Sequence, residues 1–153
     1  MSDCIFCKIA SKEAPAHIIW EDDSHMAFLS IFPNTEGTTV VIPKEHKDSS
    51  VFNLEDKELA YLVLASKKTS KMLEAAFDDV GKVALVFEGF GVDHAHAKLY
   101  PMHGTGNMTS WKPIESNQPV YYEKYPGYVD SRDGEMSPPE ELESVLKKIK
   151  SES

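Results

Sequence analysis

Residues 93–103, DHAHAKLYPMH, carry three histidines and a lysine in one short run. Residues 94–100 are predicted to form a strand, and side chains in a strand alternate between its two faces. His94, His96 and Lys98 are therefore expected on one face, with the apolar residues between them on the other. Three ionisable side chains on one face indicate a reactive or metal-binding surface, and a solvated strand face is the alternative.

The rest of the expected sheet comes from four segments rich in β-branched and aromatic residues. They are residues 17–22, 26–31, 38–43 and 82–88. Residues 54–77 have apolar side chains at helical spacing and predict one long helix, with Asn53 as its N-cap. Strands joined by turns, together with one long helix, predict an α+β fold with a five-stranded antiparallel sheet.

The domain organisation follows from the length of 153 residues, which suits one compact domain better than two. We expect this domain over residues 1–103. Residues 104–153 are expected to form a C-terminal arm that packs on the same domain and ends in a short helix. Ser137, Pro138 and Glu140 give that helix a favourable start.

The composition excludes some classes of partner. The net charge of −9 argues against a protein that coats a polynucleotide or an anionic membrane, because those partners require a basic surface. A small nucleotide needs only a few local cations and backbone N–H groups. The sequence has no run of about 18 apolar residues, and its N-terminus, MSDCIFCK, lacks a signal-peptide pattern. We therefore expect a soluble cytoplasmic protein.

The two cysteines of the chain, Cys4 and Cys7, form a C-x-x-C pair. In a reducing compartment such a pair more often binds a metal or does redox chemistry than forms a structural disulfide. A closed tetrahedral zinc site needs two further ligands, and His46 and His94 are the candidates. The alternative is two free thiols in a packed N-terminal helix.

His96 would remain free of this metal site while lying two residues from one of its ligands. A neutral imidazole is a competent nucleophile towards phosphorus or an acyl carbon. The alternative is a histidine that supports the metal site or belongs to the core.

Three stretches, in order along the chain, resemble the histidine-triad (HIT) superfamily of nucleotide-binding proteins, in its branch with an N-terminal zinc site. They are DCIFCKIASKEAPAHIIWEDDSHMAFLSIFP (3–33), GTTVVIPKEH (37–46) and VDHAHAKLYP (92–101). The resemblance implies an α+β fold, a homodimer that joins two sheets, and a nucleoside monophosphate group bound near the triad.

The same resemblance implies residue roles. The middle histidine of the family's triad attacks the α-phosphorus and forms a covalent nucleotidyl intermediate, and His96 has that position here. The family's zinc ligands fall on Cys4, Cys7, His46 and His94, which would hold one structural Zn²⁺ per chain. Backbone N–H groups and Lys98 would stabilise the charge of the phosphate.

The nucleotide pocket in such proteins is lined by the N-terminal segment, the second strand and the turn before the triad. The residues implied here are Ile5, Phe6, Phe28, Leu29, Ser30, Gly89 and Gly91. The alternative for the residues of the N-terminal segment and the second strand is a place in the core, and that is the expected place of Ile9 and Ile31 in the same segments.

Among the departures from the family's pattern, two concern residues assigned to the site. Ser30 replaces the aspartate that usually holds the ribose hydroxyls, and a hydroxyl lacks the charged, bidentate grip of a carboxylate. Lys98 occupies the third triad position, where hydrolases of the family have histidine and nucleotidyl transferases have glutamine. Lysine supplies a cation and a donor on a flexible stem, and its proton handling differs from that of histidine.

Two functions are consistent with these features. The leading one is a nucleotide hydrolase or nucleotidyl transferase that acts at the α-phosphate of a nucleotide conjugate. The alternative is a zinc-stabilised nucleotide-binding or scaffold protein with little or no catalysis. A thiol redox protein would need a thioredoxin-like βαβ unit, which this sequence does not predict.

Overall fold

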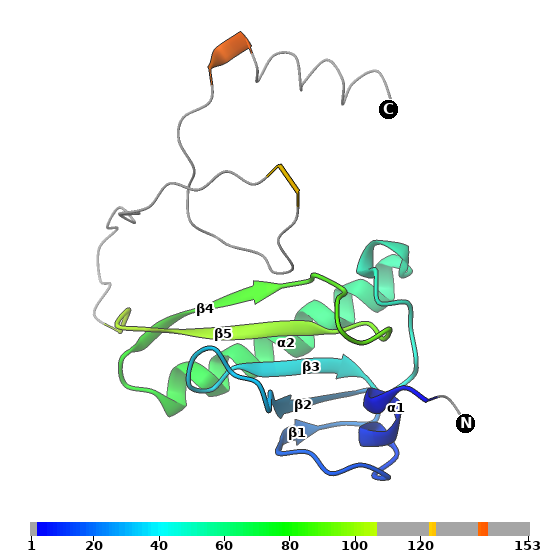
Figure 1. The fold of residues 1–153 in the computed structure, drawn as a ribbon. Coiled ribbons are helices and arrows are strands. Elements are labelled where there is room, and N and C mark those ends of the chain that lie inside the picture. The colour runs from blue at the N-terminus through cyan, green and yellow to red at the C-terminus, as the bar shows by residue number, and fades with distance from the viewer. Residues whose placement is uncertain (1–2, 107–122, 125–137, 141–153) are drawn as a thin grey trace. The chain divides into compact units, whose positions relative to one another are not determined.

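The computed structural model describes residues 3–106, 123–124 and 138–140 (Figure 1). The elements, in order, are α1 (Ile5–Ala10), β1 (Ile18–Glu21), β2 (His25–Leu29), β3 (Thr39–Pro43), the 3-10 helix η1 (Val51–Asn53), α2 (Asp56–Ala76), β4 (Val80–Val86) and β5 (Ala97–His103). The predicted α+β class is confirmed, with one five-stranded antiparallel sheet and one long helix.

The sheet has the strand order β1-β2-β3-β5-β4, so its last strand in sequence lies between β3 and β4 (Figure 1). The register pairs Val41 of β3 with Ala97 of β5, and Val86 of β4 with Lys98 of β5. Because β5 has neighbours on both sides, it brings the segment that precedes it next to the end of β3. This placement positions the histidine run.

The two faces of the sheet bury separate cores, as the alternation of side chains in a strand requires. On one face, α2 packs against a core that includes Ala27, Val41, Leu62 and Leu99. On the other face, residues of α1 pack against a second core. That core consists of Ile9, Met26, Phe28, Val40 and Ile42, with Phe6 partly buried against it. The cysteine-bearing helix α1 therefore lies on the face opposite α2.

The start of α2 differs from the prediction that Asn53 caps it. Asn53 ends η1 instead, and its side-chain amide donates to Asp48 Oδ2 at 2.9 Å. The N-cap is Glu55, which forms a capping box with Glu58. Reciprocal bonds between these two residues satisfy backbone N–H groups at the first turn. The predicted long helix is confirmed, but its N-cap lies two residues further along the chain than Asn53.

The last strand also begins later than predicted, at Ala97 rather than His94. The backbone N–H of His94 donates to the Val92 carbonyl at 2.9 Å, and that of Ala95 donates to the Lys47 carbonyl at 2.9 Å. These groups bind loop carbonyls instead of joining the strand ladder. The expected separation of side chains still holds, because Ala95, Ala97 and Leu99 all belong to the core beneath α2.

The chain divides into two compact units, residues 1–111 and 112–153. Within the second unit, Pro139 and Glu140 are helical, at the point where the short C-terminal helix is predicted. The remainder of that helix and most of the predicted arm lie outside the described residues, and the packing of the arm stays a prediction. Across the described parts of the chain, no helix has the length and apolar character needed to span a membrane.

Candidate functional site

Four side chains that are far apart in sequence meet at one end of the sheet. They are Cys4, Cys7, His46 and His94, hereafter the Cys/His cluster, and their possible ligand atoms all lie within 4.8 Å of one another. Two of them come from α1 and its N-cap, one from the loop after β3, and one from the loop before β5. The four candidates for a metal site are thus brought together by the fold.

Local structure explains how each cluster residue arrives there. Cys4 is the N-cap of α1 and Cys7 lies three residues later, so one helical turn presents both sulfurs on the same side. Pro43 ends β3 and releases the chain into the loop that carries His46. The bond from the Ala95 N–H to the Lys47 carbonyl holds this loop against the segment that carries His94.

The spacing of the donor atoms suits a tetrahedral zinc ion. His94 Nδ1 lies 3.5 Å from the sulfurs of both Cys4 and Cys7, and His46 Nδ1 lies 3.4 Å from the Cys7 sulfur. Tetrahedral Zn²⁺, with bonds of roughly 2.3 Å to sulfur and roughly 2.0 Å to nitrogen, holds such atoms about 3.5 Å apart. The residues present therefore fit the metal in type, number and spacing.

The protonation of His94 also suits a metal ligand. Its Nε2 lies 2.8 Å from the Pro43 carbonyl oxygen. Because a carbonyl oxygen only accepts, Nε2 must carry the proton, and the Nδ1 lone pair then faces the two sulfurs. Burial lowers the pKa of His94, whose side chain is fully buried. Fixing the ring through its second nitrogen is the usual way a protein orients a histidine ligand.

His96 lies next to the cluster and has the opposite tautomer. Its Nδ1 is 2.7 Å from the His94 carbonyl oxygen and must donate to it, which leaves the lone pair on Nε2. Burial lowers the pKa of His96 by more than its hydrogen bond to the His94 carbonyl raises it, so the neutral ring is favoured. The ring of Phe6 packs against it edge to face, with centroids 5.4 Å apart. A buried, neutral imidazole with a fixed tautomer is suited to nucleophilic attack.

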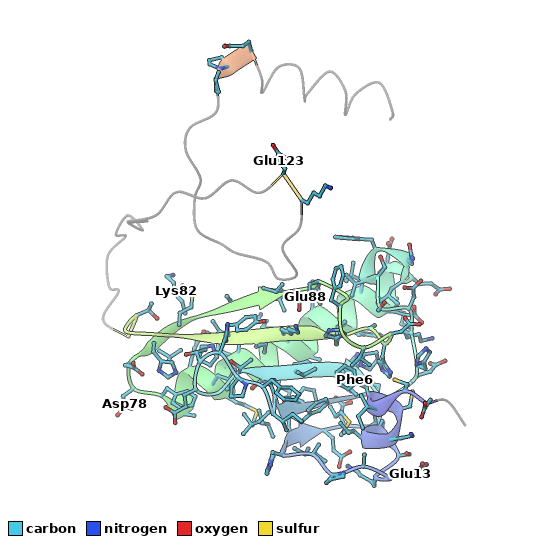
Figure 2. The ribbon with its side chains drawn as sticks, viewed as in Figure 1. Phe6, Glu13, Asp78, Lys82, Glu88 and Glu123 are labelled. Carbon is cyan, nitrogen blue, oxygen red and sulfur yellow. The ribbon has the colours of Figure 1, made fainter. Side chains whose placement is uncertain are left out.

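Lys98 has a charged partner, since its Nζ forms an ion pair with the Glu88 carboxylate. Glu88 follows the end of β4, and Figure 2 labels it near the end of that strand. Its side chain is only 8% exposed, against 29% for Lys98. Sequence reasoning missed Glu88. The available signal was its place two residues beyond Val86, the residue that pairs with Lys98.

The predicted nucleotide-binding residues fall into exposed and buried groups. Ile5 and Leu29 are 45% and 39% exposed, whereas Phe28 is buried in the core beneath α1 and contacts Phe6 edge to face. Ser30 follows β2, and its hydroxyl oxygen accepts the backbone N–H of Phe32 at 3.2 Å. Phe6 is the member of this set that reaches both histidines, with ring centroids 5.9 Å from His94 and 5.4 Å from His96.

The two isoleucines that were expected in the core behave differently. Ile9 is buried, as predicted. Ile31 is 73% exposed, and its prediction as a core residue is wrong. The reason is that β2 ends at Leu29, so Ile31 lies in the turn beyond the sheet, where neither core covers it.

Gly89 and Gly91 shape the turn between β4 and the histidine run. Both have a positive φ, +69° and +84° respectively, which L-residues with a side chain rarely adopt. At Gly89 a Cβ would lie 2.8 Å from the Ser49 carbonyl oxygen, whereas a Cβ at Gly91 would meet no atom within 4 Å. The turn therefore needs glycine most at position 89, immediately after Glu88.

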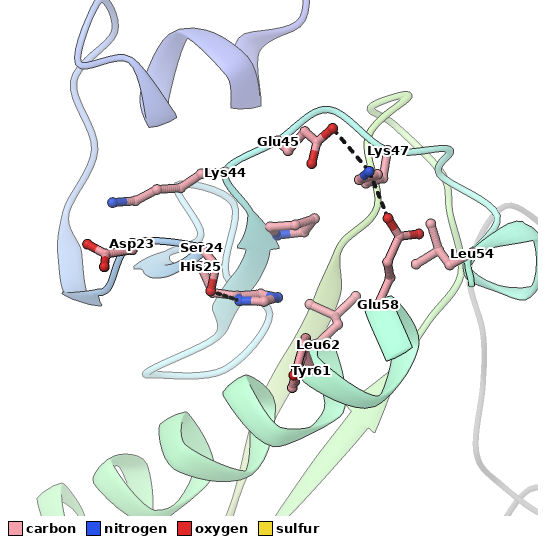
Figure 3. Close-up of a pocket in the computed structure, with 11 residues that line it drawn as sticks. Asp23, Ser24, His25, Lys44, Glu45, Lys47, Leu54, Glu58, Tyr61 and Leu62 are labelled. Carbon is pink, nitrogen blue, oxygen red and sulfur yellow. Dashed lines mark hydrogen bonds and ion pairs between the residues drawn. The ribbon is translucent and has the colours of Figure 1, made fainter. Parts of the chain in front are cut away.

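A separate pocket lies between the ends of β2 and β3 and the first turns of α2 (Figure 3). Its lining includes Ser24, His25, Lys47, Glu58 and Leu62, and none of the predicted site residues is among the lining side chains. Lys47 bridges Glu45 and Glu58, and Ser24 Oγ lies 2.9 Å from His25 Nδ1. These polar side chains are paired with one another, so His96 remains the candidate for the reactive residue.

Comparison with known proteins agrees with this geometry. The sequence model of the HIT domain family matches residues 11–103. An uncharacterized HIT-like protein from Borreliella burgdorferi is 38% identical over 107 residues, which cover 66% of this chain and 76% of that protein. Adenosine 5'-monophosphoramidase hnt1 from Schizosaccharomyces pombe is 34% identical over 102 residues, which cover 64% of this chain and 73% of that enzyme.

One solved structure of a similar chain contains zinc. The Zn-bound histidine triad family protein from Mycobacterium smegmatis superimposes with a TM-score of 0.58 at 27% sequence identity. The match covers 74% of this chain and 84% of that protein. A chain of the same fold and detectable sequence similarity thus binds zinc.

Proposed function

The chain belongs to the HIT domain family, and from that premise we propose that it is a nucleotide hydrolase or nucleotidyl transferase. Its substrate would be a nucleotide conjugate, and the reaction would take place at the α-phosphorus. The observation that carries this proposal is the 2.7 Å contact from His96 Nδ1 to the His94 carbonyl, which leaves Nε2 with its lone pair. The relative named as an adenosine 5'-monophosphoramidase supports the same reaction class.

The proposed reaction has two steps. In the first, the His96 Nε2 lone pair forms a bond to the α-phosphorus, and the bond from phosphorus to the leaving group breaks with its electron pair on that group. The Lys98 ammonium, on the same side of the chain as His96, gives a proton to a leaving nitrogen. In the second step, water or another acceptor attacks the phosphorus, its proton passes to Lys98, and the electron pair of the P–N bond returns to His96.

Several groups would hold the nucleotide in this proposal. Ile5 and Leu29 offer exposed apolar surface for a base, and the edge of Phe6 lies against His96. Ser30 can accept the Phe32 N–H and still donate its own proton to a ribose hydroxyl. The turn with Gly89 and Gly91 would bring backbone N–H groups close to the phosphate. Such a close approach of the backbone requires residues without side chains. Phe28 would contribute indirectly, because its ring packs against Phe6 and supports it.

The Cys/His cluster would hold one zinc ion with a structural role. All four positions of a tetrahedral site would come from protein side chains, which is typical of structural rather than catalytic zinc. The ion would tie α1 to the loops before β5 and after β3. Two further expectations complete the proposal, a homodimer and a cytoplasmic location. Sedimentation tests the first, with an expected mass of twice the 17.1 kDa chain.

The second candidate function is a nucleotide-binding or scaffold protein with little or no catalysis. Two observations favour it: Glu88 neutralises Lys98 at the third triad position, and the Ser30 oxygen is already used within its own turn. One experiment separates the two functions. Purified protein is given an adenosine 5'-phosphoramidate, and release of adenosine monophosphate is followed beside calorimetric binding of adenosine monophosphate.

The enzyme hypothesis predicts product release that His96→Ala lowers by at least about a thousandfold while nucleotide binding persists. His17→Ala is the matched control, because His17 is exposed and precedes β1. Binding without product release by the unsubstituted protein, over a panel of phosphoramidates and dinucleotides, would instead support the binding function.

A further inference from the structure

The third triad position of this chain holds a charge pair and not a single charge. Lys98 Nζ contacts a carboxylate oxygen of Glu88, whose side chain is 8% exposed. Ala97 points into the core beneath α2, so His96 and Lys98 on either side of it point to the opposite side of the chain. A carboxylate is therefore held beside the cation that would meet the group departing from phosphorus.

The fold fixes the place of Glu88. Val86 pairs with Lys98 across β4 and β5, and Glu88 follows two residues later, at the point where the chain leaves β4. Gly89 then turns the chain with a positive φ and brings its backbone against the Ser49 carbonyl. The strand register fixes the chain before Glu88, and the turn at Gly89 fixes the chain after it. The position of the Glu88 carboxylate is therefore defined by the fold.

A carboxylate at this place distinguishes leaving groups by charge. A phosphate or polyphosphate departs as an anion, and a nearby negative charge opposes the build-up of that charge. An amine departs after taking up a proton and is neutral or positive, so the carboxylate does not oppose it. A lone lysine cation would have the reverse preference, since it attracts the anion.

We propose that Glu88 is a specificity-determining residue on the leaving-group side of His96, and that it favours nucleoside phosphoramidates over nucleotides whose leaving group is a phosphate or polyphosphate. This inference rests on the proposed function and narrows its substrate class. Both substrate classes undergo the same attack by His96, so the preference appears in the relative values of kcat/KM.

The test uses two substrates that share an adenosine 5'-phosphoryl group. One is an adenosine 5'-phosphoramidate of an alkylamine, and the other is diadenosine triphosphate, which loses a nucleoside diphosphate. The ratio of kcat/KM for the amine conjugate to that for the polyphosphate is measured in the unsubstituted protein and in Glu88→Gln. Glutamine keeps the shape of glutamate and can still accept a hydrogen bond from Lys98, but it has no charge.

We expect Glu88→Gln to lower this ratio by about tenfold or more, mainly by raising kcat/KM for diadenosine triphosphate. The matched control is Glu74→Gln on α2, which also removes a carboxylate from an ion pair, here with Lys71, and should leave the ratio unchanged. An unchanged ratio in Glu88→Gln, with both substrates still turned over, would overturn this inference alone. Failure of the unsubstituted protein to act on either substrate would overturn the proposed function and this inference with it.

A second measurement decides the question if Glu88→Gln does not fold. It compares, in the unsubstituted protein, phosphoramidates whose amines end in an ammonium group or in a carboxylate. The expected kcat/KM is about tenfold lower for the carboxylate-bearing amine. Equal values for the two amines would overturn the role of Glu88.

Discussion

The ring of His96 donates from Nδ1 to the backbone carbonyl oxygen of His94, over 2.7 Å. The side chain of the same His94 has its Nδ1 3.5 Å from the sulfurs of Cys4 and Cys7. One residue thus supplies a donor atom to the Cys/His cluster through its side chain and sets the tautomer of the proposed nucleophile through its backbone. A metal ion held by the cluster would therefore be linked to the orientation of His96 through a single position of the chain.

Elemental analysis checks the metal assignment. We expect about one zinc ion per chain after purification without a chelator, and loss of that zinc in the double variant Cys4→Ser, Cys7→Ser, because serine hydroxyls are poor zinc ligands. Thermal unfolding of the double variant should begin at a lower temperature, since the ion would tie α1 to two loops. His46→Ala should also lose zinc, whereas His17→Ala, which removes an exposed imidazole outside the cluster, should retain it. Purified protein without metal would contradict the assignment.

Substitutions at the two glycines of the turn before the histidine run should differ in cost. Gly89→Ala places a Cβ 2.8 Å from the Ser49 carbonyl oxygen, at a φ of +69°. In Gly91→Ala the added Cβ has no atom within 4 Å, so the expected cost comes from the φ of +84° alone. We expect Gly91→Ala to lower the free energy of unfolding by about 1–2 kcal/mol and Gly89→Ala by more. Urea unfolding measures both, and equal losses would show that the Ser49 contact has no effect.

His103 should make stability depend on pH. Its Nε2 lies 3.0 Å from the Glu36 carbonyl oxygen and its Nδ1 lies 3.0 Å from Asp79 Oδ1, so the protonated ring satisfies both acceptors. The Glu36 carbonyl and then the Asp79 carboxylate raise the pKa of His103 above its ordinary value. The ring of Phe77 packs against it edge to face.

A raised pKa in the folded state gives stability that is fully present below the unfolded pKa of about 6.5 and is lost as the pH rises through the folded pKa. Asp79, whose pKa the His103 ring lowers, stays ionised over this range. His103→Gln should therefore lower the free energy of unfolding more at about pH 6 than at about pH 8.5. Urea unfolding at both pH values gives the difference between the two proteins. A loss that is the same at both pH values, or larger at the higher pH, would show that folding does not raise the pKa of His103.

The sequence patterns that predicted the fold correctly are local ones. Runs such as TVVIP, the residues of β3, predict a strand because β-branched side chains suit a pleated sheet. The long helix follows from apolar residues at helical spacing. The start of β5 could not be predicted in the same way, because the backbone N–H of Ala95 is bound by the carbonyl of Lys47, a residue distant in sequence. The prediction that Ile31 lies in the core is wrong because β2 ends at Leu29, before that residue.

The candidate site was predictable where motif spacing identifies chemistry. The C-x-x-C pair and the histidine run contain three of the four cluster residues, and His46 is the further candidate ligand that the residues offer and the resemblance also implies. Glu88 was not predictable from such spacing, because its contact with Lys98 depends on the register that pairs Val86 with Lys98. A register is decided by long-range strand pairing, and so charge pairs across strands remain hidden in a single sequence.

The most direct test of the proposed reaction is capture of the covalent intermediate on His96. The protein is mixed with adenosine 5'-phosphoramidate labelled in the phosphate, quenched in denaturant at alkaline pH, where a phosphorus–histidine bond survives, and the labelled peptide is mapped. We predict acid-labile label on His96, approaching one per chain when breakdown is slower than formation. The label should persist in His17→Ala and disappear in His96→Ala, whose zinc content stays the same. Turnover that continues in His96→Ala, or label on another residue, would contradict the assignment of His96 as the nucleophile.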